Sequence, residues 1–230
     1  MTTTYEVIAT LIRACQACPL AFRGAGVAGE YVDGCMREPH LCKCPPTEIM
    51  IIGEAPGRVE QEEGRPFVGE SGQLLRALLE ECGVSAAYLT NVVKHRPPVT
   101  IGYKGKQEKP NAEAIKACAG FLDAEIELIR PTKLVLLGNV AASRLLKVAS
   151  NTAQKELVNR VWKVDLGYGE VEALTLFHPA YFLHSRTAPW VNRALSEWKR
   201  SLRNFLGAPI PNYPIEKVIC ATSHESAQRG

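Results

Sequence analysis

Four short apolar segments, each followed by a segment with apolar residues at helical spacing, constrain the fold of this chain most. The apolar segments span residues 48–52, 88–93, 133–138 and 171–177. The helical patterns lie around residues 73–79, 111–130, 141–147 and 191–205, with a further short helix expected over 5–16. Short buried strands that alternate with helices are typical of a parallel sheet covered on both faces. The sequence therefore predicts an α/β fold with a mostly parallel, four-stranded central sheet.

The composition limits the class of protein and its partners. Of 230 residues, 46% are hydrophobic and 22% are charged, which excludes a disordered chain, a collagen and a coiled coil. No apolar run approaches the roughly 18 residues that span a bilayer, and the N-terminus lacks signal-peptide features. The net charge of +3 permits a polyanionic partner on a local basic surface, and the eight cysteines are too few for a disulfide scaffold. We therefore expect a cytoplasmic protein with metal-binding cysteines and no membrane contact.

The segment after the first predicted strand is rich in glycine and carries carboxylates. It runs from Gly53 to Glu60 and continues through residues 64–72. Ligands of open parallel sheets bind at the carboxyl ends of the strands, where glycines let the backbone approach them. The segment is no P-loop, because no Gly-Lys-Ser/Thr closes it, and it does not match the dinucleotide fingerprint. Glu54, directly after the strand, is a candidate site residue, with an ordinary turn residue as the alternative.

Two further polar side chains follow later strands. Asn91 ends the second strand, where its amide can offer a donor and an acceptor to a planar base edge; a structural Asx turn is the alternative. His178 and Pro179 follow the fourth strand and place an imidazole at the mouth of the cleft. A lone histidine is more often simply packed or solvated, so its position alone does not assign a role.

The motifs at these strand ends resemble those of a known family. They read Gly-Glu-Ala-Pro-Gly-x-x-Glu from Gly53, Gly-Arg-Pro-Phe-Val-Gly from Gly64, Thr-Asn-Val-Val-Lys from Thr90 and His-Pro-x-Tyr from His178. In this order and spacing they resemble the family 4 uracil-DNA glycosylases, which carry an iron–sulfur cluster, over roughly residues 12–206.

The resemblance implies a fold, an activity and a partner. The fold would be an α/β/α sandwich in a single domain over residues 1–208, with an insertion at 19–46 and an irregular tail at 209–230. The activity would be that of a monofunctional hydrolase that flips deoxyuridine out of DNA and hydrolyses its N-glycosidic bond to start base excision repair. The partner would be uracil-containing DNA, single or double stranded, bound by a nucleoid-associated monomer.

The resemblance also assigns roles in the uracil pocket. Phe67 would stack on the uracil ring, Asn91 would bond its Watson–Crick edge and reject cytosine, and Glu60 would exclude the methyl group of thymine. Glu54 would stabilise the oxocarbenium-like sugar or orient the attacking water, as carboxylates do in glycoside hydrolysis. His178 would donate a hydrogen bond to the uracil anion. Backbone N–H groups near two residues of the first motif would support it, namely Gly53 and Ala55.

The segment from Pro179 to Arg186 reads as the DNA-facing loop of the family. Leu183 would fill the gap left by the flipped base, and Arg186 would hold a flanking phosphate. The family usually has serine where this chain has Ala180, which removes one hydroxyl contact to phosphate. Core packing is the alternative for Leu183 and its neighbour Phe182.

Three cysteines match the cluster ligands of the family, and one position departs from it. Cys15 and Cys18 match the first two ligands and Cys118 the last, whereas His95 stands where the third cysteine is usual. Imidazole can ligate cluster iron and tends to raise the reduction potential. We expect a 4Fe-4S cluster held by these four residues.

The same histidine occurs in the covalent uracil-trapping branch of the superfamily. That branch needs a loop histidine as nucleophile and a glutamine after the first motif's glutamate. The loop over residues 96–110 contains no histidine, and Ala55 stands where the glutamine would be. Covalent trapping is therefore not expected.

The insertion contains Cys35, His40, Cys42 and Cys44, for which the family offers no counterpart. Cys44 could replace His95 as the fourth ligand, the four residues could form a separate zinc site, or the thiols could be free. Cys82 and Cys220 are expected to be unliganded.

Two other functions are alternatives to uracil excision. One is a uracil-DNA binding protein that recognises or traps the base without releasing product, against which the intact Glu54 and His178 argue. The other is an iron–sulfur redox module, or an interaction module associated with a DNA polymerase, in which the pocket is vestigial.

Overall fold

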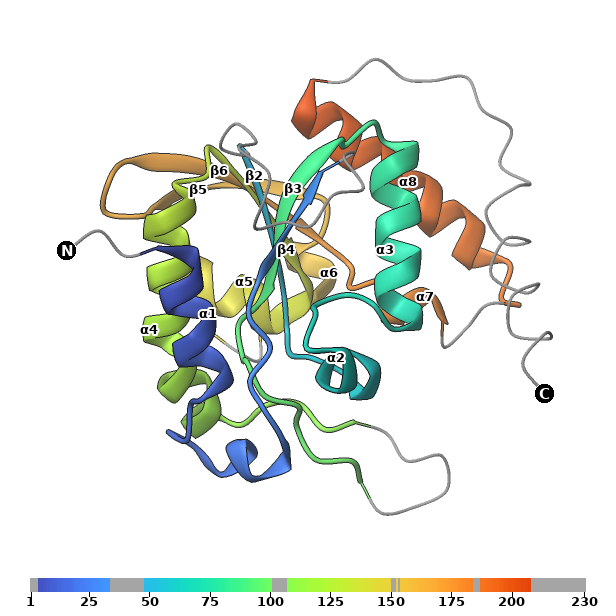
Figure 1. The fold of residues 1–230 in the computed structure, drawn as a ribbon. Helices are drawn as coiled ribbons and strands as arrows, with labels where there is room; N and C mark the ends of the chain where they lie inside the picture. Colours follow the sequence, from blue (N-terminus) through green and yellow to red (C-terminus); the bar gives the residue numbers. More distant parts are fainter. Residues whose placement is uncertain are drawn as a thin grey trace.

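A computed structural model of the chain describes residues 4–33, 48–100, 107–149, 152, 154–183 and 187–207 (Figure 1). Within these residues six strands form one sheet in the order β1-β3-β2-β4-β6-β5. The strands are β1 (Glu30–Asp33), β2 (Ile49–Gly53), β3 (Ala86–Asn91), β4 (Lys133–Leu137), β5 (Arg160–Asp165) and β6 (Glu170–Leu176). The α/β class is confirmed.

The four predicted strands are the parallel centre of this sheet. β3, β2, β4 and β6 are neighbours that run in the same direction, whereas β1 and β5 are antiparallel edge strands. The predicted number of four strands is wrong, because it leaves out both edges. β1 lies in the segment predicted as a loop, and most side chains of β5 are exposed. Neither edge strand therefore carries the continuous apolar run of a strand that is buried on both faces.

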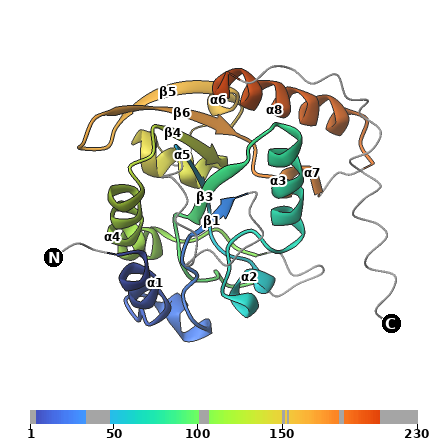
Figure 2. The ribbon, with the colours of Figure 1, turned by 45° about the horizontal axis from the view of Figure 1, so that its top comes forward.

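Helices cover both faces of the sheet, as the two views in Figures 1 and 2 show. On one face lie α4 (Ala112–Ile129) and α5 (Gly138–Leu146), with α1 (Tyr5–Arg13) packed against α4. On the other lie α3 (Glu70–Glu81), α7 (Ala180–Leu183) and α8 (Trp190–Leu206). Shorter segments are the 3₁₀ helix η1 (Pro19–Arg23), α2 (Arg58–Glu63) and α6 (Gln154–Leu157). The predicted α/β/α sandwich is confirmed.

Strand β2 contributes side chains to the apolar cores on both faces of the sheet. Met50 and Ile52 belong to the apolar core under α4 and α5, whereas Ile51 belongs to the core under α3 and α8. All three side chains are fully buried. Alternate side chains of a strand point to opposite faces, so a strand between two layers of helices needs apolar residues at every position. None of the helices in the described ranges is long and apolar enough to cross a membrane.

The carboxyl ends of the parallel strands meet at one edge of the sheet. Gly53 at the end of β2 pairs with Asn91 at the end of β3. β6 ends at Leu176, two residues before His178. The topology therefore brings the segments after three strands to the same edge, where an open α/β sheet binds its ligands.

Candidate active site at the carboxyl edge of the sheet

Three of the predicted pocket residues meet at this edge. A Cβ atom on Gly53 would lie 2.5 Å from Asn91 Oδ1 and 2.6 Å from Phe67 Cζ, so only glycine leaves room between them. Asn91 and Phe67 are buried, with 4% of each residue exposed. An aromatic ring, an amide and an open stretch of backbone thus share one site. This combination can stack on a planar base and bond to its edge.

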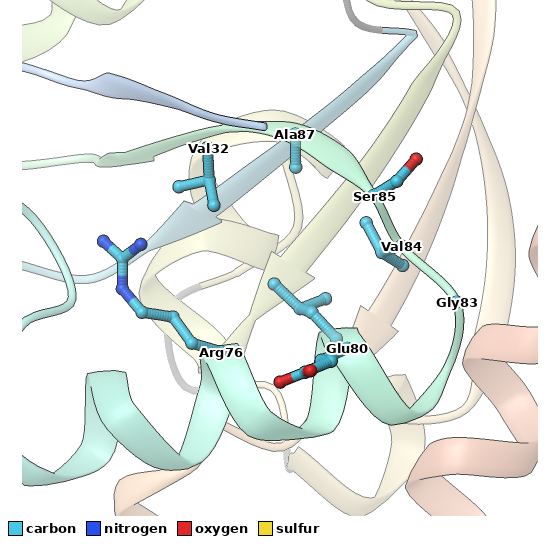
Figure 3. A pocket seen from close by; sticks show the side chains of 8 residues that line it. Val32, Arg76, Glu80, Gly83, Val84, Ser85 and Ala87 are labelled. Atoms are coloured by element: carbon cyan, nitrogen blue, oxygen red, sulfur yellow. The ribbon is translucent and has the colours of Figure 1, made fainter. Parts of the chain in front are cut away.

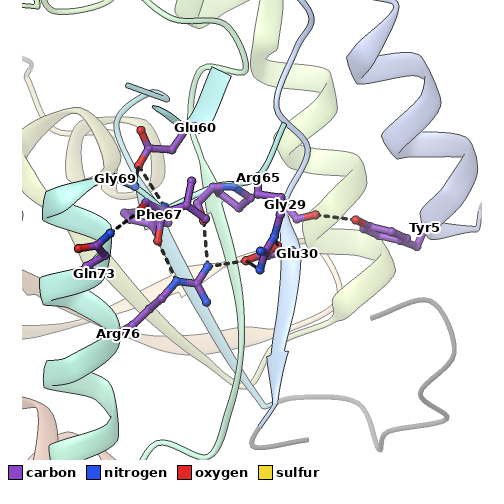
Figure 4. Close-up of polar contacts among 11 residues, drawn as sticks. Tyr5, Gly29, Glu30, Glu60, Arg65, Phe67, Gly69, Gln73 and Arg76 are labelled. Carbon is purple, nitrogen blue, oxygen red and sulfur yellow. Dashed lines mark hydrogen bonds and ion pairs between the residues drawn. The ribbon is translucent and has the colours of Figure 1, made fainter. Parts of the chain in front are cut away.

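The turn that carries Phe67 is conformationally strained and firmly held. The backbone φ of Phe67 is 55°, a left-handed conformation that costs a residue other than glycine about 1 kcal/mol or more. Arg76 Nε donates to the Phe67 carbonyl at 2.8 Å, and a terminal nitrogen of Arg76 donates to the Pro66 carbonyl at 3.0 Å (Figure 4). Gly72 is also required, because a Cβ there would lie 2.1 Å from the Phe67 carbonyl carbon. The ring position therefore depends on the first turns of α3.

Arg76 is held in turn by the buried carboxylate of Glu30. The Glu30 side chain is 6% exposed, pairs with Arg76, and accepts from Arg65 Nε at 2.8 Å (Figure 4). The Arg65 side chain is 55% exposed, so this network reaches solvent. Glu30 in the edge strand β1 thus supports the Phe67 turn through Arg76. The sequence analysis did not predict this network.

Glu60 fixes the loop between α2 and α3. Its carboxylate accepts the backbone N–H groups of Gly57 at 3.1 Å, Val68 at 3.1 Å and Gly69 at 2.8 Å. The residue is 7% exposed. The carboxylate is therefore a rigid part of the wall beside Phe67, because three donors hold it in one place.

His178 can donate a hydrogen bond from Nε2. Its Nδ1 accepts the backbone N–H of Ala180 at 3.2 Å, which leaves the proton of the neutral ring on Nε2. Burial lowers the pKa of His178 to about 4, so the ring is neutral near pH 7. The ring centroid lies 6.2 Å from that of Phe67, with an interplanar angle of 27°. A neutral N–H donor thus lies beside the aromatic wall of the pocket.

Glu54 and Ala55 follow β2 directly and are half-buried. The Glu54 carbonyl accepts the N–H of Val93 at 3.0 Å, and the Gly53 carbonyl accepts that of Val92 at 3.0 Å. These bonds keep the segments after β2 and β3 side by side. The first motif and Asn91 therefore belong to one continuous piece of structure.

The segment predicted to face DNA begins as the short helix α7. Phe182 is 1% exposed, so core packing accounts for it, and Leu183 is half-buried against the same core. Tyr181 is 42% exposed and is the most open of these apolar side chains. Pro179 is buried, and Arg186 lies outside the described residues.

Three free thiols lie together on the α4 side of the sheet. Cys15 follows α1, Cys18 precedes η1, and Cys118 is in the middle of α4. Cys18 and Cys118 are buried in the same core. Burial raises the pKa of the Cys118 thiol, and the nearby Cys18 and Cys15 thiols raise it further. The topology therefore brings the three predicted cysteine ligands together from distant parts of the chain.

His95 adds an unpaired imidazole to this region. It follows Lys94, whose backbone N–H donates to Cys118 Sγ at 3.4 Å. His95 is 1% exposed, and among the described residues neither ring nitrogen has a hydrogen-bond partner. Buried polar atoms are nearly always paired, so an orphaned ring beside thiols suits a metal ligand.

The chemistry of these four groups decides which metal group they could hold. No three His, Cys, Asp or Glu side chains in the described ranges are placed to hold one metal ion. A four-iron cluster takes one protein ligand on each iron, so its ligands stand farther apart than those of one ion. Three thiols and an imidazole are a donor set that can hold an iron–sulfur cluster, and zinc accepts the same set.

Comparisons with known proteins settle the family. A sequence profile described as the uracil DNA glycosylase superfamily matches residues 39–224. The chain belongs to this superfamily. The type-4 uracil-DNA glycosylase of Pyrobaculum aerophilum is 32% identical over 208 residues, which cover 88% of this chain and 93% of that protein. The type-4 enzymes of Thermotoga maritima (34% identical; 79% and 84% covered) and Sulfurisphaera tokodaii (33%; 93% and 90%) are similar too. The resemblance to family 4 is confirmed.

A buried ion pair behind Asn91 of this glycosylase was also missed by sequence reasoning. Lys94 Nζ lies 2.6 Å from Glu125 Oε2, and both side chains are 0% exposed. The ammonium also donates to Thr90 Oγ1 and to the Asn91 carbonyl, each at 2.8 Å. The final lysine of the Thr-Asn-Val-Val-Lys motif is the signal that pointed to it.

The remaining cysteines fall into two groups. Outside the described residues lie Cys220 and the four candidate ligands of the insertion, Cys35, His40, Cys42 and Cys44. Cys82 is buried between α3 and α8, with its Sγ 3.8 Å from the Lys199 carbonyl, and burial raises its pKa to about 11. A thiol that stays protonated in an apolar core is unreactive.

A separate apolar cavity lies at the other end of β3. Its volume is about 410 Å³, and its lining includes Val32, Leu79, Val84 and Ala87 (Figure 3). Because β3 runs from Ala86 to Asn91, the cavity borders the amino end of this strand. It is therefore distinct from the candidate site at the carboxyl edge of the sheet.

Proposed function

We propose that this glycosylase flips deoxyuridine from DNA into the pocket at the carboxyl edge and hydrolyses its N-glycosidic bond. The convergence of Gly53, Phe67 and Asn91 in a chain of this superfamily carries the proposal. A base inside a duplex is out of reach, so the nucleotide must leave the stack first. Several similar proteins are named uracil-DNA glycosylases.

The chemistry is divided between a carboxylate and a neutral imidazole. Bond cleavage leaves positive charge on the sugar and negative charge on uracil. Glu54 stabilises the oxocarbenium-like sugar or orients the attacking water. His178 donates from Nε2 to the uracil anion, helped by backbone N–H groups near Gly53 and Ala55. A main-chain N–H fixes the His178 tautomer, and the alanine at position 180 supplies it as well as the usual serine would.

Recognition uses the two sides of the pocket. Phe67 stacks on the uracil ring while Asn91 pairs with its Watson–Crick edge. Glu60 excludes the methyl group of thymine at the pyrimidine 5-position. Its three backbone hydrogen bonds support this role, since a rigid wall rejects an added methyl group better than a mobile one.

DNA contacts continue beyond the pocket along the segment after His178. Ala180 faces the DNA backbone, Leu183 fills the space of the flipped nucleotide, and Arg186 holds a flanking phosphate. The burial of Pro179 counts against the contact predicted for it. The glycosylase acts as a monomer on single- or double-stranded DNA.

We propose that Cys15, Cys18, Cys118 and His95 hold a 4Fe-4S cluster. When bound, the cluster would cross-link the segment after α1, the end of β3 and α4, beside the DNA-binding face and outside the bond-cleaving step. Iron content per chain tests the ligand set. His95→Cys should keep iron, His95→Ala should lose much of it, and Cys44→Ala should change little. Iron that follows Cys44 instead of His95 would contradict this ligand assignment without contradicting the proposed glycosylase activity.

A base-substitution assay tests the activity itself. Purified protein is incubated with labelled oligonucleotides that differ only in one base, uracil, thymine or cytosine, and each product is treated with alkali. Strand cleavage is expected at uracil alone, because alkali breaks the abasic site left by excision. Tight binding to the uracil strand without cleavage would instead identify a binding protein.

A further inference from the structure

One fully buried lysine lies between the uracil pocket and the thiols. Lys94 comes three residues after Asn91 and one before His95. Its ammonium contacts three oxygens, namely Glu125 Oε2 at 2.6 Å, Thr90 Oγ1 at 2.8 Å and the Asn91 carbonyl at 2.8 Å. The charged group is therefore fully engaged inside the protein, and one of its bonds goes to the residue that faces the base.

The backbone of Lys94 makes two further connections. Its N–H donates to Cys118 Sγ at 3.4 Å, and its carbonyl accepts the N–H of Val27 at 2.7 Å. Lys94 thus contacts strand β3, helix α4 and the segment that follows η1. Strand β3 carries Asn91 and helix α4 carries Cys118, so a single residue links the base-reading side chain to one of the proposed cluster ligands.

Glu125 locks the lysine in place. Its Oε1 accepts the N–H of Gly29 at 2.9 Å and the hydroxyl of Tyr88 at 3.2 Å, while Oε2 accepts from Thr90 and Lys94. Taking two charges out of water gains little stability, and an apolar pair of similar volume often serves as well. What an apolar pair cannot supply is a rigid donor at the Asn91 carbonyl.

We propose that Lys94, held by Glu125, is a positioning residue for uracil recognition. It fixes the last peptide of β3, and with it the direction of the Asn91 amide, from behind the pocket. This inference rests on the proposed function. Discrimination between uracil and cytosine should therefore depend on a side chain that contacts neither base, whereas Glu54 and His178 keep their places.

The test separates positioning from folding by removing the charges together. Lys94→Met with Glu125→Gln leaves no unpaired charge, and the glutamine still accepts from Gly29 and Tyr88. The measurements are the thermal midpoint, the iron content, and the ratio of uracil to cytosine excision in matched oligonucleotides. We expect a wild-type midpoint and iron content with a ratio that falls about 10-fold, the size of one lost hydrogen bond. An unchanged ratio in the folded double variant would overturn the proposal.

Two controls keep the outcome decisive. Lys199→Met with Glu81→Gln removes a partly buried pair, 2.8 Å apart between α8 and α3, and should leave the ratio unchanged. Thr90→Val keeps the volume and removes the hydroxyl that accepts from the ammonium and donates to Glu125, so a roughly threefold fall in the ratio is expected. If the double variant does not fold, an unchanged ratio in Thr90→Val overturns the proposal. Absence of excision by the wild-type protein would instead reject the proposed function.

Discussion

The side chains that would touch uracil and the side chains that hold them differ in how they are built. Asn91 ends β3, His178 follows β6, and Phe67 lies in the turn between α2 and α3; the three meet at one edge of the sheet. The Lys94–Glu125 pair lies behind Asn91, and the Arg76–Glu30 pair lies behind Phe67. Replacing a residue at the edge should therefore change chemistry or base choice, whereas replacing one behind it should act on stability and position.

The two supporting pairs also differ from each other. Lys94 and Glu125 are both 0% exposed, whereas the Glu30 network ends in Arg65, whose side chain is 55% exposed. Salt screens exposed charges far more than buried ones. A higher salt concentration should therefore weaken the ion pairs behind Phe67 more than the ion pair behind Asn91.

Apart from Glu54, the residue of the edge with the largest expected effect on rate is His178. His178→Ala removes a donor to charge that exists only in the transition state, so the single-turnover excision rate should fall about 100- to 1000-fold. Affinity for uracil-containing DNA should survive. Tyr181→Phe, three residues away and still able to stack on Phe177, is the matched control and should keep the wild-type rate. Equal rates for both variants would place His178 outside the reaction.

Asn91→Asp should alter base choice instead of rate alone. The amide N–H that uracil O4 needs becomes an acceptor, which suits the amino group of cytosine. The ratio of uracil to cytosine excision should fall at least about 100-fold, because buried polar groups are then mispaired. Asn192→Asp on the exposed side of α8 serves as the control. If discrimination survives, Asn91 does not read the base.

Arg76→Ala tests the support behind Phe67. It removes two donors from the strained turn and one partner from buried Glu30, so the unfolding free energy should fall by about 2 kcal/mol and KM should rise about 10-fold. Urea unfolding and steady-state kinetics measure the two effects. Arg144→Ala, which breaks a surface pair with Asp123, should cost less than about 1 kcal/mol. Equal losses in the two variants would mean that Arg76 has no special role.

The last prediction concerns stability alone, through its dependence on pH. Burial lowers the pKa of His178 from 6.5 to about 4, so between these values the unfolded chain binds a proton that the folded chain does not. Stability should therefore rise with pH across this window and be lost as the pH falls through it. His178→Gln should flatten that part of the profile, measured by urea unfolding at each pH. If His178 instead made the free energy of unfolding fall as the pH rises from 4 to 6.5, this prediction would be contradicted.

The sequence predicts the residues at the carboxyl edge of the sheet better than the ion pairs that support them. Glu54, Asn91 and His178 stand directly after apolar strands, and parallel topology alone brings such positions together. The supporting pairs join residues far apart in the chain, 31 positions for Lys94 and Glu125 and 46 for Glu30 and Arg76. Lys94 stands in a motif, but no local pattern marks Glu125 as its partner or joins Glu30 to Arg76.

The same reasoning explains which strands were predictable. The four central strands are buried on both faces and read as apolar runs, whereas β1 and β5 pair along one side only. The short helix α7 also escaped prediction, although Phe182 within it completes the core under α8. Its sequence carries too few residues for a helical period to be visible.

Single-turnover excision by Glu54→Ala, measured together with its affinity for uracil-containing DNA, tests the central claim most directly. Glu54 acts on charge that develops on the sugar, so the rate should fall at least about 1000-fold while affinity stays within a few fold of wild type. Iron content should match that of the wild-type protein, because Glu54 is not among the proposed ligands. A near-wild-type rate for Glu54→Ala would contradict the assignment of bond cleavage to the carboxyl edge of the sheet.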